Sequence, residues 1–145
     1  TSLWALTRSE DFAKGFVGLL ANPQSIGHAF HITSDEALTW NQITETLAAA
    51  VGVEANIVHI ASDFIVKVMP DRYGSLLGDK SWSVMFDNTR IKTFVPEYVA
   101  TIPFHTGIRR TLAWYAEDAS RRTVDADLNA QIDRVIDAYA GALNG

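Results

Sequence analysis

The chain has 145 residues, of which 48% are hydrophobic and 20% are charged, so it contains enough apolar material to bury a substantial core. Its net charge is −5 and its 12 lysines and arginines are scattered, which disfavours binding to nucleic acid or to an anionic membrane surface. It contains no cysteine, which excludes disulfides and thiolate metal sites. It has no apolar run of membrane-spanning length and no signal-peptide pattern, so we expect a single cytoplasmic domain that binds neither nucleic acid nor membrane.

The beginning of the chain predicts a strand followed by an amphipathic helix. Residues 3–7 form a short apolar run, Ser9 then stands where a helix N-cap is expected, and Asn22-Pro23 supplies the stop signal. The apolar residues between these signals recur at three- and four-residue spacing. They predict a buried stripe made of Phe12, Phe16, Leu19 and Leu20.

The next stretch predicts the same order of elements. Residues 29–33 alternate as a half-buried strand would, a turn is expected at 34–36, and Thr39 stands at the N-cap position of a helix. Gly52 can end that helix by adopting a left-handed conformation. Its buried face is predicted to consist of Trp40, Ile43, Leu47 and Val51.

The rest of the chain predicts one more strand, at residues 56–60, and four more helices. An irregular stretch at residues 71–87 follows Pro70 and includes a short extended piece at 82–86. The helices are expected to begin at four start signals: Ser62, Asn88, the His105-Thr106 pair and Thr123. The chain is therefore predicted to be α/β, with short strands, five to six helices and a helix-rich C-terminal end.

Few residues are candidates for metal binding or acid–base chemistry. His28 and His31 are three residues apart in a predicted strand, so their side chains point to opposite faces and cannot hold one ion. The other two histidines are interpreted as structural or solvated. Neighbouring carboxylates fall in a turn or at helix ends, where helix dipoles account for several of them, and Asp79-Lys80 is interpreted as a surface ion pair.

The sequence lacks the signatures of the common catalytic and nucleotide sites. It contains no G-x-G-x-x-G, G-x-x-x-x-G-K, G-x-S-x-G or H-E-x-x-H pattern, and none of its four tyrosines is followed by a lysine four residues later. We therefore expect the chain by itself to be catalytically inactive and to bind no dinucleotide.

Four segments, taken in order, resemble the C-terminal half of extended short-chain dehydrogenases/reductases, the NAD-dependent epimerase/dehydratase family. The first is a strand-then-helix segment with a fixed aspartate and alanine, and the second is the next strand and the start of its helix. The third resembles the family's glycine-aspartate and aspartate-serine-lysine region, and the fourth its closing glycine-initiated helix. They span Trp4–Ala13, Ala29–Ser34 with the helix from Thr39, Gly78-Asp79 with Phe86–Lys92, and Thr106–Tyr115.

This resemblance implies that residues 1–145 are the substrate-binding part of a longer Rossmann-type enzyme. The family's dinucleotide site and its Tyr-x-x-x-Lys pair belong to the N-terminal half, which is absent from this sequence. The intact parent would use NAD or NADP to act on a small-molecule substrate, as an epimerase, dehydratase or reductase.

Departures from the family pattern narrow the expected substrate. Members that act on nucleotide-diphosphate sugars commonly carry arginines at the position of Trp4 and shortly before the glycine-aspartate, where residues 75–77 are Ser-Leu-Leu. Tryptophan and leucine cannot pair with diphosphate oxygens as arginine does, so a nucleotide-diphosphate sugar is disfavoured. A small sugar-like or carbonyl/hydroxyl substrate is favoured, and the expected substrate-binding residues are Trp4, Arg8, Tyr73 and Trp82.

A second interpretation is a non-catalytic α/β module that stands alone and binds a ligand or another protein. A region separated from its partner half is expected to expose apolar faces, and such faces can pair with a second copy of the chain. We therefore also expect exposed apolar surface and homo-oligomer formation.

Overall fold

The computed structural model describes residues 2–144, which fall into two compact units. The first unit runs up to Ala55 and adds Ser83–Trp114, and the second comprises Asn56–Trp82 with the residues from Tyr115 onward. The chain therefore enters the second unit twice.

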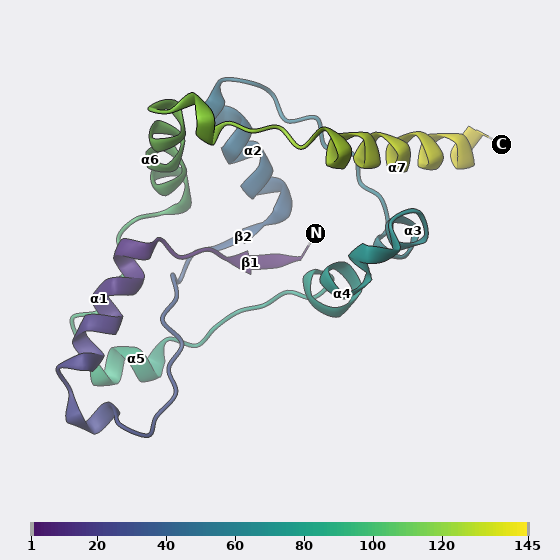
Figure 1. The fold of residues 1–145 in the computed structure, drawn as a ribbon. Coiled ribbons are helices and arrows are strands. Elements are labelled where there is room, and N and C mark those ends of the chain that lie inside the picture. The colour runs from purple at the N-terminus through teal and green to yellow at the C-terminus, as the bar shows by residue number, and fades with distance from the viewer. Residues whose placement is uncertain (1, 145) are drawn as a thin grey trace. The chain divides into compact units, whose positions relative to one another are not determined.

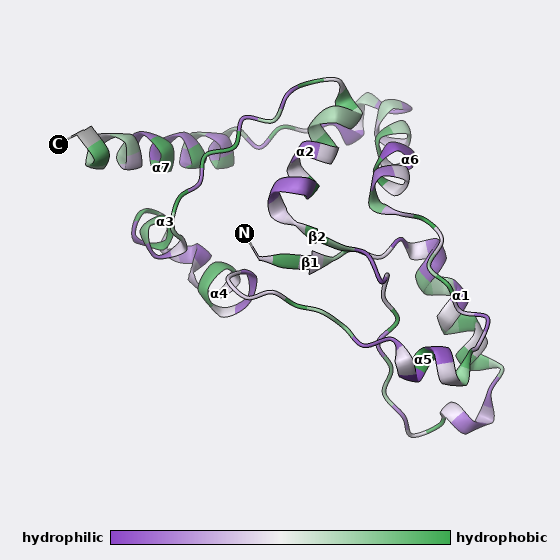
Figure 2. Ribbon diagram, turned by 180° about the vertical axis from the view of Figure 1, so that it is seen from behind, coloured by the Kyte–Doolittle hydropathy of each residue, from purple (hydrophilic) through white to green (hydrophobic). Residues whose placement is uncertain are grey.

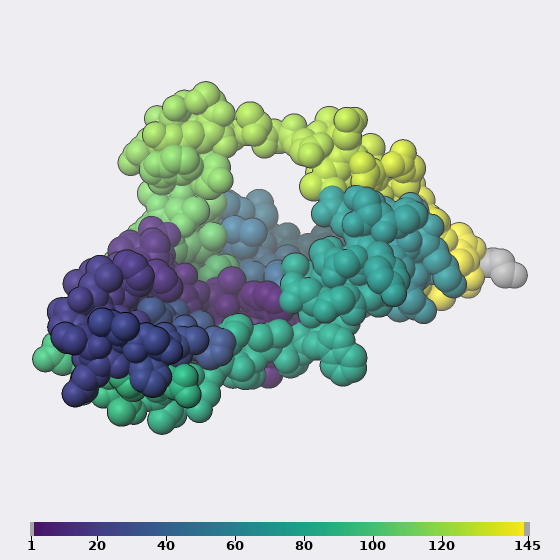
Figure 3. Space-filling model, turned by 60° about the horizontal axis from the view of Figure 1, so that its bottom comes forward, coloured from purple at the N-terminus to yellow at the C-terminus, as the bar shows by residue number. Residues whose placement is uncertain are grey.

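The first unit contains the sheet and most of the segments that carry the family resemblance. Strands β1 (Leu3–Ala5) and β2 (Ala37–Thr39) pair antiparallel, with Trp4 opposite Leu38. Its helices are α1 (Ser9–Leu20), a 3₁₀ turn (Pro23–Ser25), α2 (Trp40–Val51), α5 (Thr89–Phe94) and α6 (Phe104–Ala116), whose last residues belong to the second unit (Figure 1). Helices α1 and α5 lie side by side in this unit (Figure 3).

The second unit is entirely helical within the described residues. Helix α3 (Ser62–Val68) packs against α7 (Ala126–Asn144), where the rings of Phe64 and Tyr139 meet edge to face at 5.3 Å. The shorter helical pieces are Pro70–Arg72, α4 (Tyr73–Ser75), the π-helix Leu76–Lys80 and Ala119–Arg121. The stretch expected to be irregular is thus mostly helical up to Lys80.

The coarse fold class is confirmed: the described residues are α/β, with seven α-helices and a two-stranded sheet. The strands predicted at 29–33 and 56–60 are wrong, because neither stretch has a neighbouring strand to pair with among residues 2–144. Residues 82–86 form no strand either, and Val84 donates a single backbone hydrogen bond to Leu3. A periodic apolar pattern predicts an extended segment, but a strand also requires a partner.

Helix α2 forms as its sequence predicts. The Thr39 side chain accepts a hydrogen bond from the Gln42 backbone and Gln42 reaches back to Thr39, which completes a capping box. Gly52 ends the helix with φ +80°, in the left-handed region that glycine adopts readily. Ile43 is buried, whereas Leu47 and Val51 at the far end of the stripe are exposed.

Helix α1 forms where its sequence predicts, but the prediction of its buried face is wrong. Asp11 and Gly15 are buried, whereas Phe12, Phe16 and Leu20 are exposed. Hydrophobic residues recur along the helix (Figure 2), yet polar contacts and small residues set which side faces the unit. Ser9 is the first helical residue and not the cap, which is Arg8 with no side-chain cap bond.

A buried hydrogen-bond network holds the first unit together. Asn88 is 4% exposed, and its amide bonds both the backbone of Thr33 and the carboxylate of Asp35. The Tyr98 hydroxyl donates to the same Thr33 carbonyl at 2.9 Å. Asn88 therefore precedes α5 as expected, but its side chain does not cap that helix because it is engaged with residues 33–35.

Helix α7 begins two residues later than predicted, with Asp125 and not Thr123 at the cap position. Thr123 does not cap it; instead, the Asp125 carboxylate accepts the backbone N–H of Leu128 at 2.9 Å. On this helix Val135 is buried, whereas Ile132 and Leu143 are exposed.

Candidate functional site

A small pocket lies where the segment after β1 meets α6. It encloses about 190 Å³, and its polar side chains come from both segments. The pocket is lined by Leu6, Thr7, Arg8, Phe104, Gly107, Ile108 and Thr111. Its walls are mostly apolar, so Arg8 supplies its only charge among the lining residues.

The Arg8 guanidinium is held from two sides. Its Nη1 donates to the Gly107 carbonyl at 3.2 Å and to the Thr111 hydroxyl at 2.7 Å, while its Nε contacts Glu10 at 2.6 Å. Within residues 2–144, its Nη2 has no hydrogen-bond partner. The side chain is 26% exposed, so a positioned donor group remains available to a ligand oxygen.

The pKa of Glu10 reflects its hydrogen bond with Arg8. The hydrogen bond from Arg8 lowers the pKa of Glu10 to about 2, with a smaller contribution from its own backbone N–H. Arg110 lies 3.6 Å from the other Glu10 oxygen. The Arg8 cation therefore sits beside a carboxylate that stays ionised throughout the physiological pH range.

A second pocket in the same unit is larger. It encloses about 340 Å³ and is lined by Ala29, Phe30, His31, Asp87 and Arg90. Arg90 donates to the Ala29 carbonyl at 3.2 Å, and the His31 ring lies 4.9 Å from that of Phe86.

The two charged groups of this second pocket do not neutralise each other. Within the described residues no ion pair joins Asp87 to Arg90. The hydrogen bonds that Thr89 donates to Asp87 lower the pKa of that carboxyl, so it carries its charge at neutral pH.

The four expected substrate-binding residues are divided between the two units. Trp4 and Arg8 belong to the first unit, but only Arg8 lines a pocket; the Trp4 ring packs against Trp40, with centroids 5.8 Å apart. Tyr73 and Trp82 belong to the second unit and are 64% and 71% exposed. Of the four, Arg8 alone has the surroundings of a binding group.

Sequence reasoning missed the residues that complete the Arg8 pocket. Phe104, Gly107 and Thr111 follow Arg8 by about a hundred positions, and no local pattern links them to it. A Cβ at Gly107 would lie 3.4 Å from Arg8 Cδ, an ordinary van der Waals distance, so this glycine is not a signal for the site either.

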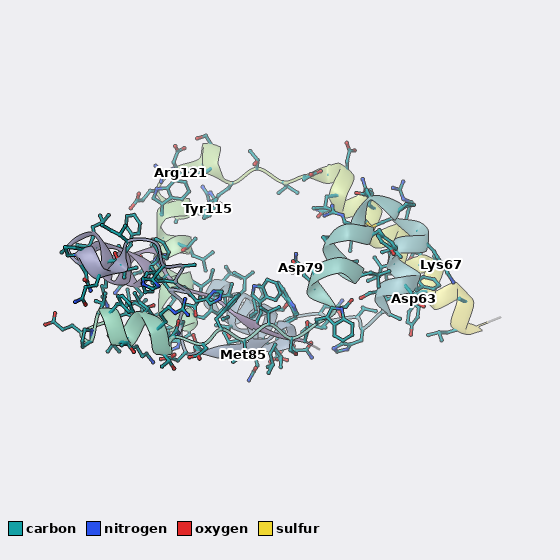
Figure 4. The ribbon with its side chains drawn as sticks, turned by 90° about the horizontal axis from the view of Figure 1, so that it is seen from below. Asp63, Lys67, Asp79, Met85, Tyr115 and Arg121 are labelled. Carbon is teal, nitrogen blue, oxygen red and sulfur yellow. The ribbon has the colours of Figure 1, made fainter. Side chains whose placement is uncertain are left out.

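The other features considered from the sequence are metal binding, the Asp79–Lys80 pair and membrane spans. Within residues 2–144, no three His, Asp or Glu side chains gather where they could hold a metal ion. Asp79, labelled in Figure 4, forms a surface ion pair of 3.3 Å with Lys80 in the π-helix after α4. None of the described helices combines the length and apolar character needed to cross a bilayer.

Comparison with known proteins gives no relative: no family model, no curated protein and no solved structure matches the chain.

Proposed function

We propose that this chain is the substrate-binding C-terminal region of an NAD(P)-dependent enzyme of the extended short-chain dehydrogenase/reductase type. The Arg8 pocket would receive part of the substrate. The dinucleotide site and the tyrosine–lysine pair would be supplied by a preceding half, so that the chain alone is inactive.

One observation carries the proposal: apart from Gly78-Asp79, which lies in the second unit, the four resembling segments contribute to the first unit, where hydrogen bonds join them in pairs. Arg8, from the first segment, bonds Gly107 and Thr111 in the closing helix. Asn88, from the third segment, bonds Thr33 in the second. Segments that resemble successive parts of one family thus make specific contacts with one another, as parts of a common fold would.

A further contact ties the first segment to the approach of α6. Asp11 corresponds to the aspartate of the resembling strand-then-helix segment. It is 1% exposed, and it accepts the backbone N–H groups of Thr101 and Ile102 at 3.0 and 2.8 Å. A fixed aspartate at this position therefore has a structural reason, because its buried carboxylate is the acceptor for those two backbone donors.

The pocket favours a small substrate with an oxygen acceptor. A volume of about 190 Å³ is below the range of about 300–1,000 Å³ typical of sites for drug-sized ligands. The open Nη2 of one positioned arginine suits a carbonyl, hydroxyl or single carboxylate better than a diphosphate, which requires more donors. The position where nucleotide-sugar enzymes of this type carry an arginine holds Trp4, which is packed on Trp40.

Calorimetric titration with NAD and NADP tests the proposal. The chain alone should bind neither, whereas a polypeptide that extends the same reading frame upstream should contain a glycine-rich strand-turn-helix and bind one of them. In that longer protein, Arg8→Gln should raise KM more than it lowers kcat. Arg90→Gln, in the other pocket, is the matched control and should leave both constants nearly unchanged. Saturable micromolar binding of NAD(P) by the chain alone would count against the proposal.

The second candidate is a stand-alone, non-catalytic ligand-binding or interaction module. The observation that favours it is the open pocket of about 340 Å³, which is complete within the first unit. A reading frame without a dinucleotide-binding half, together with ligand-induced chemical-shift changes at His31 and Arg90, would favour this candidate.

A further inference from the structure

The most unusual surface of the first unit is the outward face of α1. Its large apolar residues are all exposed, by 45% at Phe12, 47% at Phe16, 61% at Val17 and 72% at Leu20. Ile26, just after the 3₁₀ turn that follows α1, is 80% exposed. We call the five residues together the α1 face.

The helical part of the α1 face, from Phe12 to Leu20, is continuous along the helix and carries no charge. At 100° per residue, the exposed apolar positions of α1 and Ala13 fall within an arc of about 140°. Asp11, Gly15 and Gly18 occupy the opposite side. The rings of Phe12 and Phe16 stack nearly parallel, with centroids 5.8 Å apart and an interplanar angle of 16°, which gives the face a flat aromatic end.

This orientation is fixed by contacts on the other side of the helix. Asp11 is bonded to Thr101 and Ile102, and Lys14 reaches both Asp11 and the Thr101 hydroxyl at 2.6 and 2.7 Å. A Cβ at Gly15 or Gly18 would lie 2.6 Å from Ile32 or 2.4 Å from Val95, so the helix approaches its neighbours there as only glycine permits. Rotating α1 to bury its phenylalanines would break all of these contacts.

The area of the α1 face is that of an interaction surface. With roughly 150–200 Å² for each large apolar side chain, the exposed fractions correspond to on the order of 500 Å². Patches of this size on a monomer are often functional. Two such faces brought together would bury about 1,000 Å² in total, which is the lower limit for a specific protein–protein interface.

We propose that the α1 face is the interface of a homodimer in which α1 of one copy packs against α1 of a second copy. A two-fold contact requires a patch that complements itself, and an uncharged helical face does so without any matching charge on the partner. The net charge of −5 on the chain opposes association in general, but none of it lies on this face. The proposal concerns the 145-residue chain itself, whose α1 face is built wholly from its own residues.

Sedimentation equilibrium of the 145-residue chain tests the interface. Between about 1 and 100 µM the wild-type chain should pass from monomer to dimer. The double substitution Phe16→Glu and Leu20→Glu should raise the dissociation constant by about 100-fold or more, because it buries four unpaired carboxylates in the dimer. Val53→Glu is the matched control: Val53 is 59% exposed and follows α2, off the α1 face, so this variant should dimerise as the wild type does.

Disulfide trapping gives a second readout that does not depend on affinity. The chain has no cysteine, so a single Leu20→Cys substitution can cross-link only copy to copy. Under mild oxidation Leu20→Cys should trap a dimer and Val53→Cys should not. A chain that stays monomeric up to 100 µM, or a dimer that persists in the double Glu variant, would overturn the proposal.

Discussion

Helices α1 and α2 have the same length and follow the two paired strands, and both were predicted to bury an apolar stripe. They differ in which side chains they turn toward the interior of the first unit. Helix α2 turns Ile43 inward. Helix α1 turns a carboxylate and a glycine inward and leaves its phenylalanines in solvent. The contrast teaches that apolar periodicity predicts a helix reliably, whereas the buried face also depends on specific polar bonds and on close backbone approach.

The largest expected effect comes from removing the carboxylate that orients α1. Asp11→Ala removes the acceptor of two part-buried backbone donors and the ion pair with Lys14, so we expect a loss of about 3–5 kcal/mol in the free energy of unfolding. Urea denaturation measures it. The control is Asp137→Ala on the exposed side of α7, which should change stability by less than about 0.5 kcal/mol.

A pair of truncations compares the apolar faces of the two helices directly. Ile43→Ala in α2 should cost about 2–4 kcal/mol, because Ile43 is only 9% exposed. Phe16→Ala in α1 should cost well under 1 kcal/mol for the monomer, because the ring is 47% exposed. Thermal unfolding at low protein concentration, where a dimer contributes little, measures both. Equal losses would mean that Phe16 is buried in solution.

The stability changes of two Gly→Ala variants distinguish the close approach of α1 to its neighbours from the helix propensity of the residue. Gly15→Ala places a methyl group 2.6 Å from Ile32 Cγ2 and close to the Tyr98 ring, so we expect a loss of about 1–3 kcal/mol. In α7, Gly141 has nothing within 4 Å of the same methyl position, and Gly141→Ala should gain up to about 1 kcal/mol. The opposite signs of the two changes in melting temperature are the test. A neutral Gly15→Ala would show that α1 can shift away from Ile32.

Much of the secondary structure could be predicted from local signals, while the tertiary contacts could not. Thr39, Gln42 and Gly52 define both ends of α2 through bonds within a few residues. Asp11 and Arg8 form hydrogen bonds with residues about 90 to 100 positions away, and no sequence pattern near them indicates those partners.

Like the fold, the candidate site could be predicted only where the signal is local in the sequence. Arg8 was predicted to bind substrate from the first segment of the family resemblance, and it does line a pocket. The other walls of that pocket come from α6, and the exposed His31, Asp87 and Arg90 of the second pocket were not grouped, because residues 29–31 and 87–90 meet only in the folded unit.

The smallest expected effect is that of acid pH on α1 relative to α2. Burial tends to raise the pKa of Asp11, but the hydrogen bonds from Lys14 and from the Thr101 and Ile102 backbones outweigh it and lower that pKa below its unfolded value. A carboxyl with a lowered folded-state pKa stabilises the protein above its unfolded pKa of about 4, and that contribution is lost as the pH falls through the folded-state value. Residue-resolved hydrogen exchange between pH 7 and pH 3 should therefore show protection lost earlier in α1 than in α2, which turns an isoleucine inward and no carboxylate. In Asp11→Asn this difference between the helices should shrink, because the amide does not titrate. If α1 and α2 lose protection together in the wild type, then the Asp11 carboxylate does not govern how α1 is held.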